Sequence, residues 1–435
     1  HTSMAMQRAA DGQGGQGGRG RQAGPGAQAG QAHGPGHAAR MHRTDAMGGR
    51  VLEARQWTRP EADSKYIDIR FPRTLVPGER VAIRIHYAGR PRVAPNPPWG
   101  GGFVWDRTPS GAPWVGVACQ TDGAWIWWPN KDHPSDEPDR GASLSFTMPA
   151  DLTVASNGVL AGSEPVEHPD GRAFTRWSWR VANPINSYTI TLNAAPYVFM
   201  EEPYVSTAGD TMPIQFWVLP EFEEQGRRLF PQFASQIRFF EELLGPYPFR
   251  NEKYGVAHSS YLGMEHQTLI AYGADFTDGN MFDLPIGFDD LHQHELAHEW
   301  WGNLVTAWDW RDFWLHEGFG TYMQALYAEH LMGDEGYNLV MDRLRERIAG
   351  TQEIVPDGFQ TTKGVYGSGR GGDIYYKGAW ILHTLRGVVG YDAFFRILSE
   401  FAYPTAESRT RTDGLQTRFA SSTDFITLSE EISGL

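Results

Sequence analysis

Cysteine is almost absent from this sequence: Cys119 is the single one among 435 residues. A lone cysteine excludes an internal disulfide, a cysteine-rich zinc site and an iron–sulfur cluster. Any metal that the chain binds must therefore be held by His, Asp and Glu side chains. The length is sufficient to bury a substantial core and, at roughly 150 residues a domain, it predicts two or three domains.

Basic residues are scarce relative to acidic ones: 38 Lys and Arg against 52 Asp and Glu give a net charge of -14. This balance argues against a protein that neutralises phosphate backbones, so we expect no nucleic-acid partner. Long apolar runs are missing as well, since no stretch approaches the roughly 18 residues that span a bilayer, and we expect no membrane span. The first residues show no secretory signal peptide, which leaves secreted, periplasmic and cytoplasmic locations open.

Glycine is concentrated in residues 1–50, a low-complexity mixture of Gly, Gln, Ala and Arg with almost nothing to bury. We predict that this segment is disordered. Between about residues 60 and 200 the apolar residues alternate with polar ones, for example over 81–85 and 188–192. This period predicts an N-terminal, mostly antiparallel β domain over residues 51–203.

After residue 203 the spacing of apolar residues changes. Residues 214–218 are strand-like, whereas the apolar residues from Phe233 to Leu244 recur at helical spacing and predict a helix that ends at Gly245. Strands followed by helices predict an α+β fold, with a mainly helical catalytic domain over residues 204–435. The further predicted helices cover 289–304, 313–331, 335–349 and 376–401, with a glycine-rich loop at 364–372.

Residues 294–298 read His-Glu-Leu-Ala-His. On a helix His294 and His298 are about 400° apart, so both imidazoles project from one face toward a single ion. A catalytic zinc site uses three protein ligands and keeps one position open. Glu317 is the expected third ligand, because one short connection and the start of the next helix can return its carboxylate to the first helix. The pattern predicts one Zn²⁺, with Glu295 within reach of a water on the ion.

Two more histidines flank this motif. His292 points about 200° away from His294, which predicts a surface or supporting position and not a fourth ligand. For His316 the residues leave two possibilities open, support of the site or an ordinary position on a helix surface. The motif helix itself is apolar on several sides and is expected to be buried, so its His and Glu side chains need partners.

These motifs resemble the aminopeptidase N family of zinc metallopeptidases, the gluzincin aminopeptidases. The matches follow the family's order over roughly residues 60 to 430. Beyond the zinc motif, they are Gln120 with Asp122 (family Q-x-E), Asp136-Glu137-Pro138 (D-E-P), Gly263-Met264-Glu265 (G-x-M-E-N), 301–306, Glu317-Gly318-Phe319, and Tyr375-Tyr376-Lys377-Gly378 (Y-x-K-G).

The resemblance implies a thermolysin-like catalytic domain and a zinc-dependent aminopeptidase that acts on peptides with a free N-terminus. In that assignment Glu295 takes the proton of the attacking water, Tyr375 stabilises the oxyanion and Glu265 holds the free amine. The further substrate contacts that it implies are Gln120, Asp122, Gly263 and Met264, and the zinc ligands are His294, His298 and Glu317.

The chain departs from the family pattern at His266, which stands where the family has Asn. A histidine there is expected to alter the pH response of the amine site, since it can titrate near neutrality. Asp122 is shorter than the family's Glu. We also expect an incomplete β domain and a catalytic domain truncated at Leu435, as in a fragment of a longer enzyme. Two alternatives stay open: a thermolysin-like endopeptidase, which does not need Glu265, and a truncated inactive scaffold.

Overall fold

The computed structural model describes 66–71, 73–120, 123–168, 170–351, 353–366 and 371–435, together with the backbone of three short strands before residue 66. The chain forms two compact units, residues 1–89 and residues 90–435. In the first unit β1 (Met41–Asp45) pairs antiparallel with β2 (Leu52–Glu53) and β5 (Val81–Ile85), and β3 (Trp57–Thr58) pairs with β4 (Asp68–Ile69).

The predicted disordered segment 1–50 contains strand β1. These five residues pair with β5 in register, and the partner strand supplies their backbone hydrogen bonds, while disorder of residues 1–50 as a segment stays a prediction. The rest of the segment lies outside the described residues. The predicted division of the chain at residue 50 stays a prediction.

The predicted antiparallel β region is confirmed in residues 90–203. One sheet has the order β10-β11-β8 and the other has the order β6-β7-β12-β9. The alternation over 188–192 is only partly a strand, because Ser187–Thr189 form the 3-10 turn η2 and β12 begins at Leu192. The strands are β6 (Gly102–Arg107), β7 (Pro113–Ala118), β8 (Ala142–Pro149), β9 (Thr153–Ser156), β10 (Val159–Glu167), β11 (Ala173–Val181) and β12 (Leu192–Ala195).

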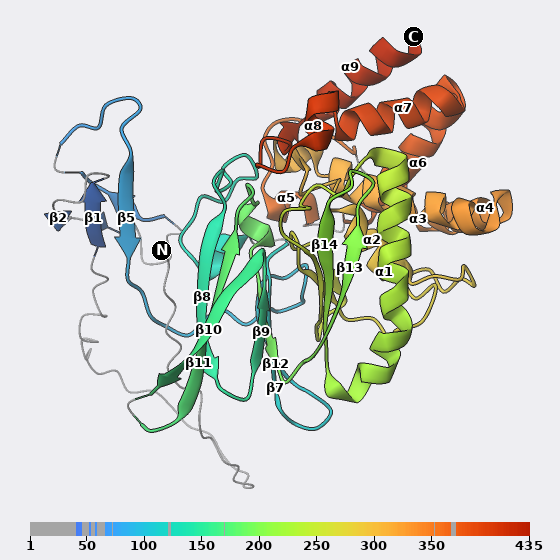
Figure 1. The fold of residues 1–435 in the computed structure, drawn as a ribbon. Helices are drawn as coiled ribbons and strands as arrows, with labels where there is room; N and C mark the ends of the chain where they lie inside the picture. Colours follow the sequence, from blue (N-terminus) through green and yellow to red (C-terminus); the bar gives the residue numbers. More distant parts are fainter. Residues whose placement is uncertain are drawn as a thin grey trace, which may run out of the picture. The chain divides into compact units, whose positions relative to one another are not determined.

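A mixed five-stranded sheet, β13-β14-β15-β17-β16, opens the predicted catalytic region. Strands β14, β15 and β17 are parallel, and the short strand β16 runs antiparallel to β17. Helix α1 (Glu223–Leu244) lies along β14 (Figure 1) and ends at Gly245 as predicted. The predicted boundary at residue 203 falls inside β13. The strands are β13 (Val198–Val205), β14 (Thr211–Val218), β15 (Tyr254–His258), β16 (Gly263–Met264) and β17 (Ile270–Tyr272).

The rest of the chain is mainly helical, as predicted, but two helices end earlier than the sequence indicates. Helix α2 (Asp290–Ala297) stops before residue 304, because the chain turns back at Gly302, where φ is 144°, and continues into β18 (Val305–Ala307). The predicted helix 376–401 is two helices that are separated at Gly390, where φ is 84°. The other elements are α3 (Trp314–Met332), α4 (Asp334–Arg347), α5 (Thr362–Tyr366), α6 (Gly371–Val389), α7 (Tyr391–Ala402), α8 (Ala406–Thr410), β19 (Arg418–Ala420) and α9 (Ser422–Ser433).

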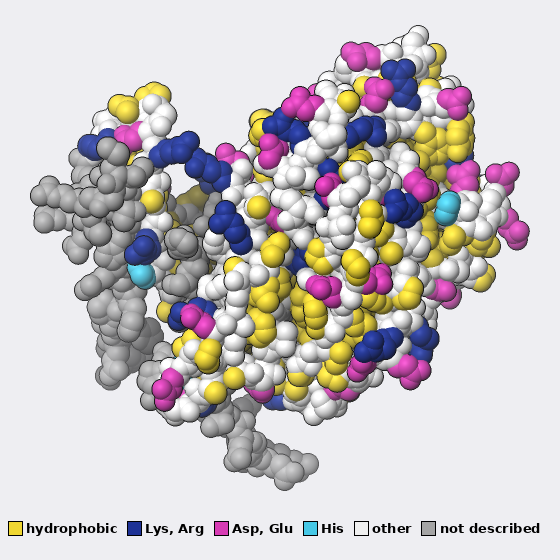
Figure 2. Space-filling model, viewed as in Figure 1, with side chains coloured by type: hydrophobic (Ala, Val, Ile, Leu, Met, Phe, Trp, Pro, Cys, Tyr) yellow, Lys and Arg dark blue, Asp and Glu magenta, His cyan; other side chains and the backbone are white. Residues whose placement is uncertain are grey.

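The glycine-rich segment 364–372 was predicted to be a loop. Its first residues belong to α5 and its last residues to α6, and 367–370 lie outside the described residues. Within the described part of the chain, we find no helix with both the length and the apolar character needed to cross a bilayer. On the face of residues 90–435 that Figure 2 shows, acidic side chains are interspersed with Lys and Arg.

Candidate active site

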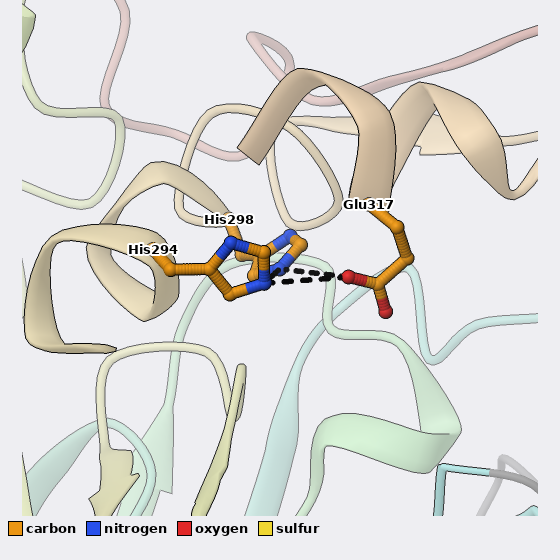
Figure 3. A group of neighbouring side chains, drawn as sticks. All are labelled: His294, His298 and Glu317. Atoms are coloured by element: carbon orange, nitrogen blue, oxygen red, sulfur yellow. Dashed lines mark hydrogen bonds and ion pairs between the residues drawn. The ribbon is translucent and has the colours of Figure 1, made fainter. Parts of the chain in front are cut away.

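Helix α2 places two imidazoles on one face, as its spacing predicts. The Asp289 side chain caps the helix by accepting the backbone N–H of His292 at 2.9 Å, and all eight residues of the helix are buried. The Nε2 atoms of His294 and His298 lie 3.2 Å apart. Figure 3 shows the two rings turned toward Glu317, which lies on the next helix, α3.

His294, His298 and Glu317 form a group that can hold one metal ion. Their ligand atoms all lie within 4.8 Å of one another, and each Nε2 is 3.4 Å from Oε2 of Glu317. Nδ1 of His298 lies 2.9 Å from the carbonyl oxygen of Trp301, which can only accept, so the proton of a neutral His298 is on Nδ1 and its Nε2 is an acceptor. Oε2 of Glu317 is buried and has no hydrogen-bond partner in the described part of the chain. Acceptors that converge in this way fit a cation, and two imidazoles with one carboxylate suit Zn²⁺.

The other oxygen of Glu317 is held by three donors. Oε1 accepts Nε2 of Gln120 at 2.7 Å, the hydroxyl of Tyr366 at 2.8 Å and the hydroxyl of Tyr375 at 3.0 Å. Burial alone would raise the pKa of Glu317, but the neighbouring His294 and His298 side chains outweigh it and lower the pKa. The carboxylate therefore stays ionised with one oxygen directed at the imidazoles.

Tyr366 is a site residue that the sequence analysis missed. It stands in a glycine-rich run with no recognisable motif, and the only available signal was a second tyrosine near Tyr375. The two hydroxyls are 3.4 Å apart. Tyr375 also lies over His294, with ring centroids 6.0 Å apart and an angle of 24° between the rings. Burial and the charge of Glu317 raise the pKa of Tyr375 well above its usual value, so its hydroxyl is a donor at neutral pH.

Glu295 and Gly263 approach each other closely. A Cβ on Gly263 would lie 2.3 Å from Oε1 of Glu295, so only glycine leaves room for this carboxylate beside strand β16. Burial raises the pKa of Glu295 well above its usual value; the charge of His298 lowers this pKa, and the charges of Glu265 and Glu317 raise it. Glu295 therefore lies close enough to the candidate metal ligands His298 and Glu317 for their charges to act on it.

Glu265 lies at the end of strand β16 and is 1% exposed. Its Oε1 accepts the hydroxyl of Tyr188 at 3.0 Å, and its Oε2 is 3.5 Å from Nε2 of Gln120. Burial raises the pKa of Glu265 to about 7. Met264 beside it is buried too. Of the two upstream candidates, Gln120 reaches the site, whereas Asp122 lies outside the described residues.

Three histidines around the site are buried, which rules out the surface positions that the sequence left open for two of them, His292 and His316. His292 is buried, not on the surface: Nδ1 lies 2.7 Å from Oε1 of Gln236, and its ring stacks on Phe233 at 4.0 Å. His316 is fully buried as well, so it is no surface residue. The expectation that His266 titrates near neutrality is wrong, because burial lowers its pKa to about 3 and keeps the ring neutral.

Two glycines set the distance between the helices that carry Glu317 and Tyr375. A Cβ on Gly318 of α3 would lie 2.9 Å from Cα of Gly378 of α6, and a Cβ on Gly378 would lie equally close to Gly318. The glycines of the E-G-F and Y-x-K-G motifs are therefore each other's packing partners. Their contact brings Tyr375, one turn before Gly378, within hydrogen-bond distance of Glu317.

We predict that Gly378→Ala lowers both activity and stability. The methyl group forces α3 and α6 apart at a cost of about 1–3 kcal/mol and displaces Tyr375 from Glu317, so kcat should fall about tenfold. The control is Gly387→Ala on the same helix, where a Cβ meets nothing within 4 Å. This control should unfold at or slightly above the wild-type temperature, with unchanged kcat. Equal Tm and kcat for the two variants would contradict the packing role.

Comparisons with known proteins agree with this geometry. Residues 234–432 match the model of the Peptidase family M1 domain. Aminopeptidase 2, mitochondrial, of Saccharomyces cerevisiae is 31% identical over 196 residues, which are 43% of this chain and 20% of that protein. Human Aminopeptidase N is 27% identical over 210 residues, 45% of this chain and 21% of that protein. The aligned part of this chain thus spans about a fifth of the curated relatives it matches.

Solved structures extend the likeness to nearly the whole chain. A mutant M1 zinc metallopeptidase from Deinococcus radiodurans, bound to a Tyr-Ser-Ala substrate, has a TM-score of 0.66 and 25% identity. The match covers 92% of this chain and 81% of that one. The two-domain M1 zinc metallopeptidase bound to L-tryptophan gives a TM-score of 0.66 at 24% identity, which shows the fold.

An antiparallel β region, a mixed sheet and a buried His-Glu-x-x-His helix that faces a glutamate of the next helix define the gluzincin class of folds. Within this class, residues 234–432 are similar to the Peptidase family M1 domain, and the chain resembles the aminopeptidases and M1 zinc metallopeptidases named above.

Proposed function

We propose that this chain is a zinc-dependent aminopeptidase, which hydrolyses the first peptide bond of peptides with a free N-terminus. One observation carries the proposal: Nε2 of Gln120 lies 2.7 Å from Glu317 and 3.5 Å from Glu265. A buried carboxylate that suits an ammonium group is therefore separated from a candidate metal ligand by a single amide. This spacing supports cleavage next to an N-terminal amine, because the anchor and the metal are about one residue apart.

The metal in this proposal is one Zn²⁺, which His294, His298 and Glu317 would hold. The unpartnered Oε2 of Glu317 and the acceptor Nε2 of His298 support the assignment. Zinc supplies two things when bound: it polarises the carbonyl of the substrate, and it lowers the pKa of the attacking water. The remaining chemistry belongs to side chains of this chain.

Glu295 is the proposed general base, since its carboxylate lies close enough to His298 and Glu317 to feel their charges and is not one of the three ligands. Tyr375 is proposed to donate its hydroxyl hydrogen to the carbonyl oxygen as that oxygen gains negative charge. Glu265 pairs with the α-ammonium. The remaining proposed substrate contacts are Gln120, Asp122 and the backbone of Gly263 and Met264.

The activity is tested with the zinc content of the chain and with arylamides of a panel of amino acids, each with and without an N-acetyl group. The proposal expects about one zinc per chain, turnover of the free amines only, and loss of turnover on treatment with a chelator that added Zn²⁺ reverses. Internal cleavage of N-blocked peptides would instead identify a thermolysin-like endopeptidase. A folded chain with no metal-dependent turnover of either substrate would be the inactive scaffold.

We predict that Glu265→Ala raises KM for free-amine substrates about 100-fold, because the variant loses a hydrogen-bonded charge pair in a buried site. The preference for free over N-acetylated substrates should fall by a similar factor. The matched control is Glu242→Ala, a glutamate on α1 that none of the described contacts places in the site. If Glu265→Ala kept wild-type selectivity, the amine would be held elsewhere.

A further inference from the structure

The hydroxyl of Tyr188 lies between two buried side chains of the site. It is 3.0 Å from Oε1 of Glu265 and 3.4 Å from Nδ1 of His316. Tyr188 is 2% exposed and His316 is fully buried. The sequence left open whether His316 supports the metal site, but no motif linked His316 or Tyr188 to the amine site, and the partners of Glu317 described above do not include them.

The backbone N–H of Ala307, on the other side of His316, determines the direction of these hydrogen bonds. The backbone N–H of Ala307 donates to Nε2 of His316 at 2.8 Å. An imidazole that accepts at Nε2 carries its proton on Nδ1, so the Nδ1–H of His316 faces the oxygen of Tyr188. The hydroxyl hydrogen of Tyr188 is then left for Glu265. On this side the Glu265 carboxylate therefore always meets the donating O–H of Tyr188 and never the lone pair of another acceptor.

The ring of Tyr188 is held by packing and does not depend on its hydroxyl for its position. It lies edge-on to Trp310 at 5.4 Å and to Phe313 at 6.1 Å. Asn157 accepts the N–H of Thr191 at 2.8 Å and donates to the carbonyl of Thr189 at 2.9 Å, which holds the turn that carries the ring. Removal of the hydroxyl alone should leave this packing in place.

Glu265 has no ion pair with a Lys or Arg among the described residues. Its two oxygens receive neutral donors only, Tyr188 on one and Gln120 on the other. A carboxylate that is oriented by neutral donors, with no salt bridge to Lys or Arg, can pair its charge with a cation of the substrate. The orientation of this carboxylate therefore depends on Tyr188, and that of Tyr188 depends on His316.

We propose that Tyr188 and His316 are positioning residues for the N-terminal ammonium of the substrate: together they hold the Glu265 carboxylate in the orientation that binds it. This inference rests on the proposed aminopeptidase function. It assigns part of the amine selectivity to the turn Ser187–Thr189 in the β region and to the residue that precedes a metal ligand on α3.

The first test is Tyr188→Phe, with kcat and KM measured on the preferred amino-acid arylamide. KM should rise about tenfold while kcat stays within about threefold, because the lost hydrogen bond orients the ground-state ammonium anchor. The control is Tyr197→Phe, a buried tyrosine whose hydroxyl donates to the carbonyl of His258 at 2.7 Å, outside the site. It loses one buried hydrogen bond as well, and its KM should equal that of wild type.

A double-mutant cycle with Glu265→Ala separates positioning from general structural damage. In the Glu265→Ala background, Tyr188→Phe should change KM less than twofold, because the carboxylate that it orients is gone. A tenfold loss that persists in this background would overturn the proposal. So would a wild-type KM for the single variant Tyr188→Phe, or an equal loss of kcat and zinc content.

Variants of His316 provide a second, independent test, which can be carried out even if Tyr188→Phe fails to fold. His316→Gln can accept from Ala307 and donate to Tyr188, so its KM should stay within threefold of wild type. His316→Leu can do neither, and its KM should rise about tenfold with zinc content retained. Equal KM for these two variants would overturn the role of His316. If the wild type cleaves free and N-acetylated substrates equally well, the proposed aminopeptidase function itself fails. The positioning role is judged separately, from the ratio of each variant's KM to that of wild type.

Discussion

Glu295→Gln should lower kcat by about three orders of magnitude while the chain keeps its zinc. An amide of nearly the same shape cannot accept the proton of the attacking water, and general-base catalysis contributes typically 10²–10⁴-fold. The substitution preserves the volume against Gly263, where a Cβ would already lie 2.3 Å from the carboxylate. None of the three candidate metal ligands is changed. The expected result is therefore a folded, metal-loaded and nearly inactive protein.

The measurement combines the zinc content with kcat and KM on the same arylamide. KM should change little, since Glu265 and not Glu295 is the proposed anchor of the amine. Glu295→Asp serves as a control variant, because it keeps a basic group but shortens its reach, and its kcat should lie between those of wild type and Glu295→Gln. Zinc lost together with activity would make Glu295 a ligand. A kcat close to that of wild type would remove it from the mechanism.

The sequence predicts the three candidate metal ligands because they lie close together along the chain. His294 and His298 are four residues apart on one helix, and Glu317 begins the next, so 3.6 residues per turn determines most of their arrangement. The motif does not predict where α2 ends. The left-hand turn at Gly302 and strand β18 depend on pairing with β19, more than 100 residues later in the chain.

Contacts between distant segments account for what the sequence could not predict. Tyr366 reaches Glu317 from 49 residues away, and Tyr188 reaches His316 from 128 residues away. No periodicity or spacing links such pairs, because they meet only when the β region and the helices pack together. His266 was misjudged for the same reason: its pKa is determined by a burial that the neighbouring residues in sequence do not reveal.

The charges of the assembled site explain why it needs cations. Glu265, Glu295 and Glu317 are all buried, and two imidazoles are the nearest basic groups. Burial of three carboxylates is costly unless positive charge accompanies them. In the proposed function, a divalent metal at Glu317 and a substrate ammonium at Glu265 would supply this charge. The acidic composition of the chain is thus matched inside the site by three buried carboxylates.

Tyr375→Phe should lower kcat by about 10²–10³-fold and leave KM within a few-fold of wild type. The hydroxyl donates to Oε1 of Glu317 at 3.0 Å, and the same oxygen also accepts from Gln120 and Tyr366. Glu317 therefore keeps two donors if, as proposed, Tyr375 turns to the carbonyl oxygen of the substrate. Because negative charge develops on that oxygen only in the transition state, the lost hydrogen bond acts on kcat and not on ground-state binding.

The control for this variant is Tyr376→Phe, the adjacent residue on α6, whose half-buried ring packs near Arg347 at 5.7 Å. It should retain wild-type kcat, since its hydroxyl is not directed at Glu317. Tyr366→Phe is the sharper comparison, because it removes a donor from the same oxygen at 2.8 Å. If Tyr375 alone serves the oxyanion, Tyr366→Phe should cost less than tenfold in kcat. Equal losses for the two tyrosines would show that the shared role is to orient Glu317, and would remove Tyr375 from transition-state stabilisation.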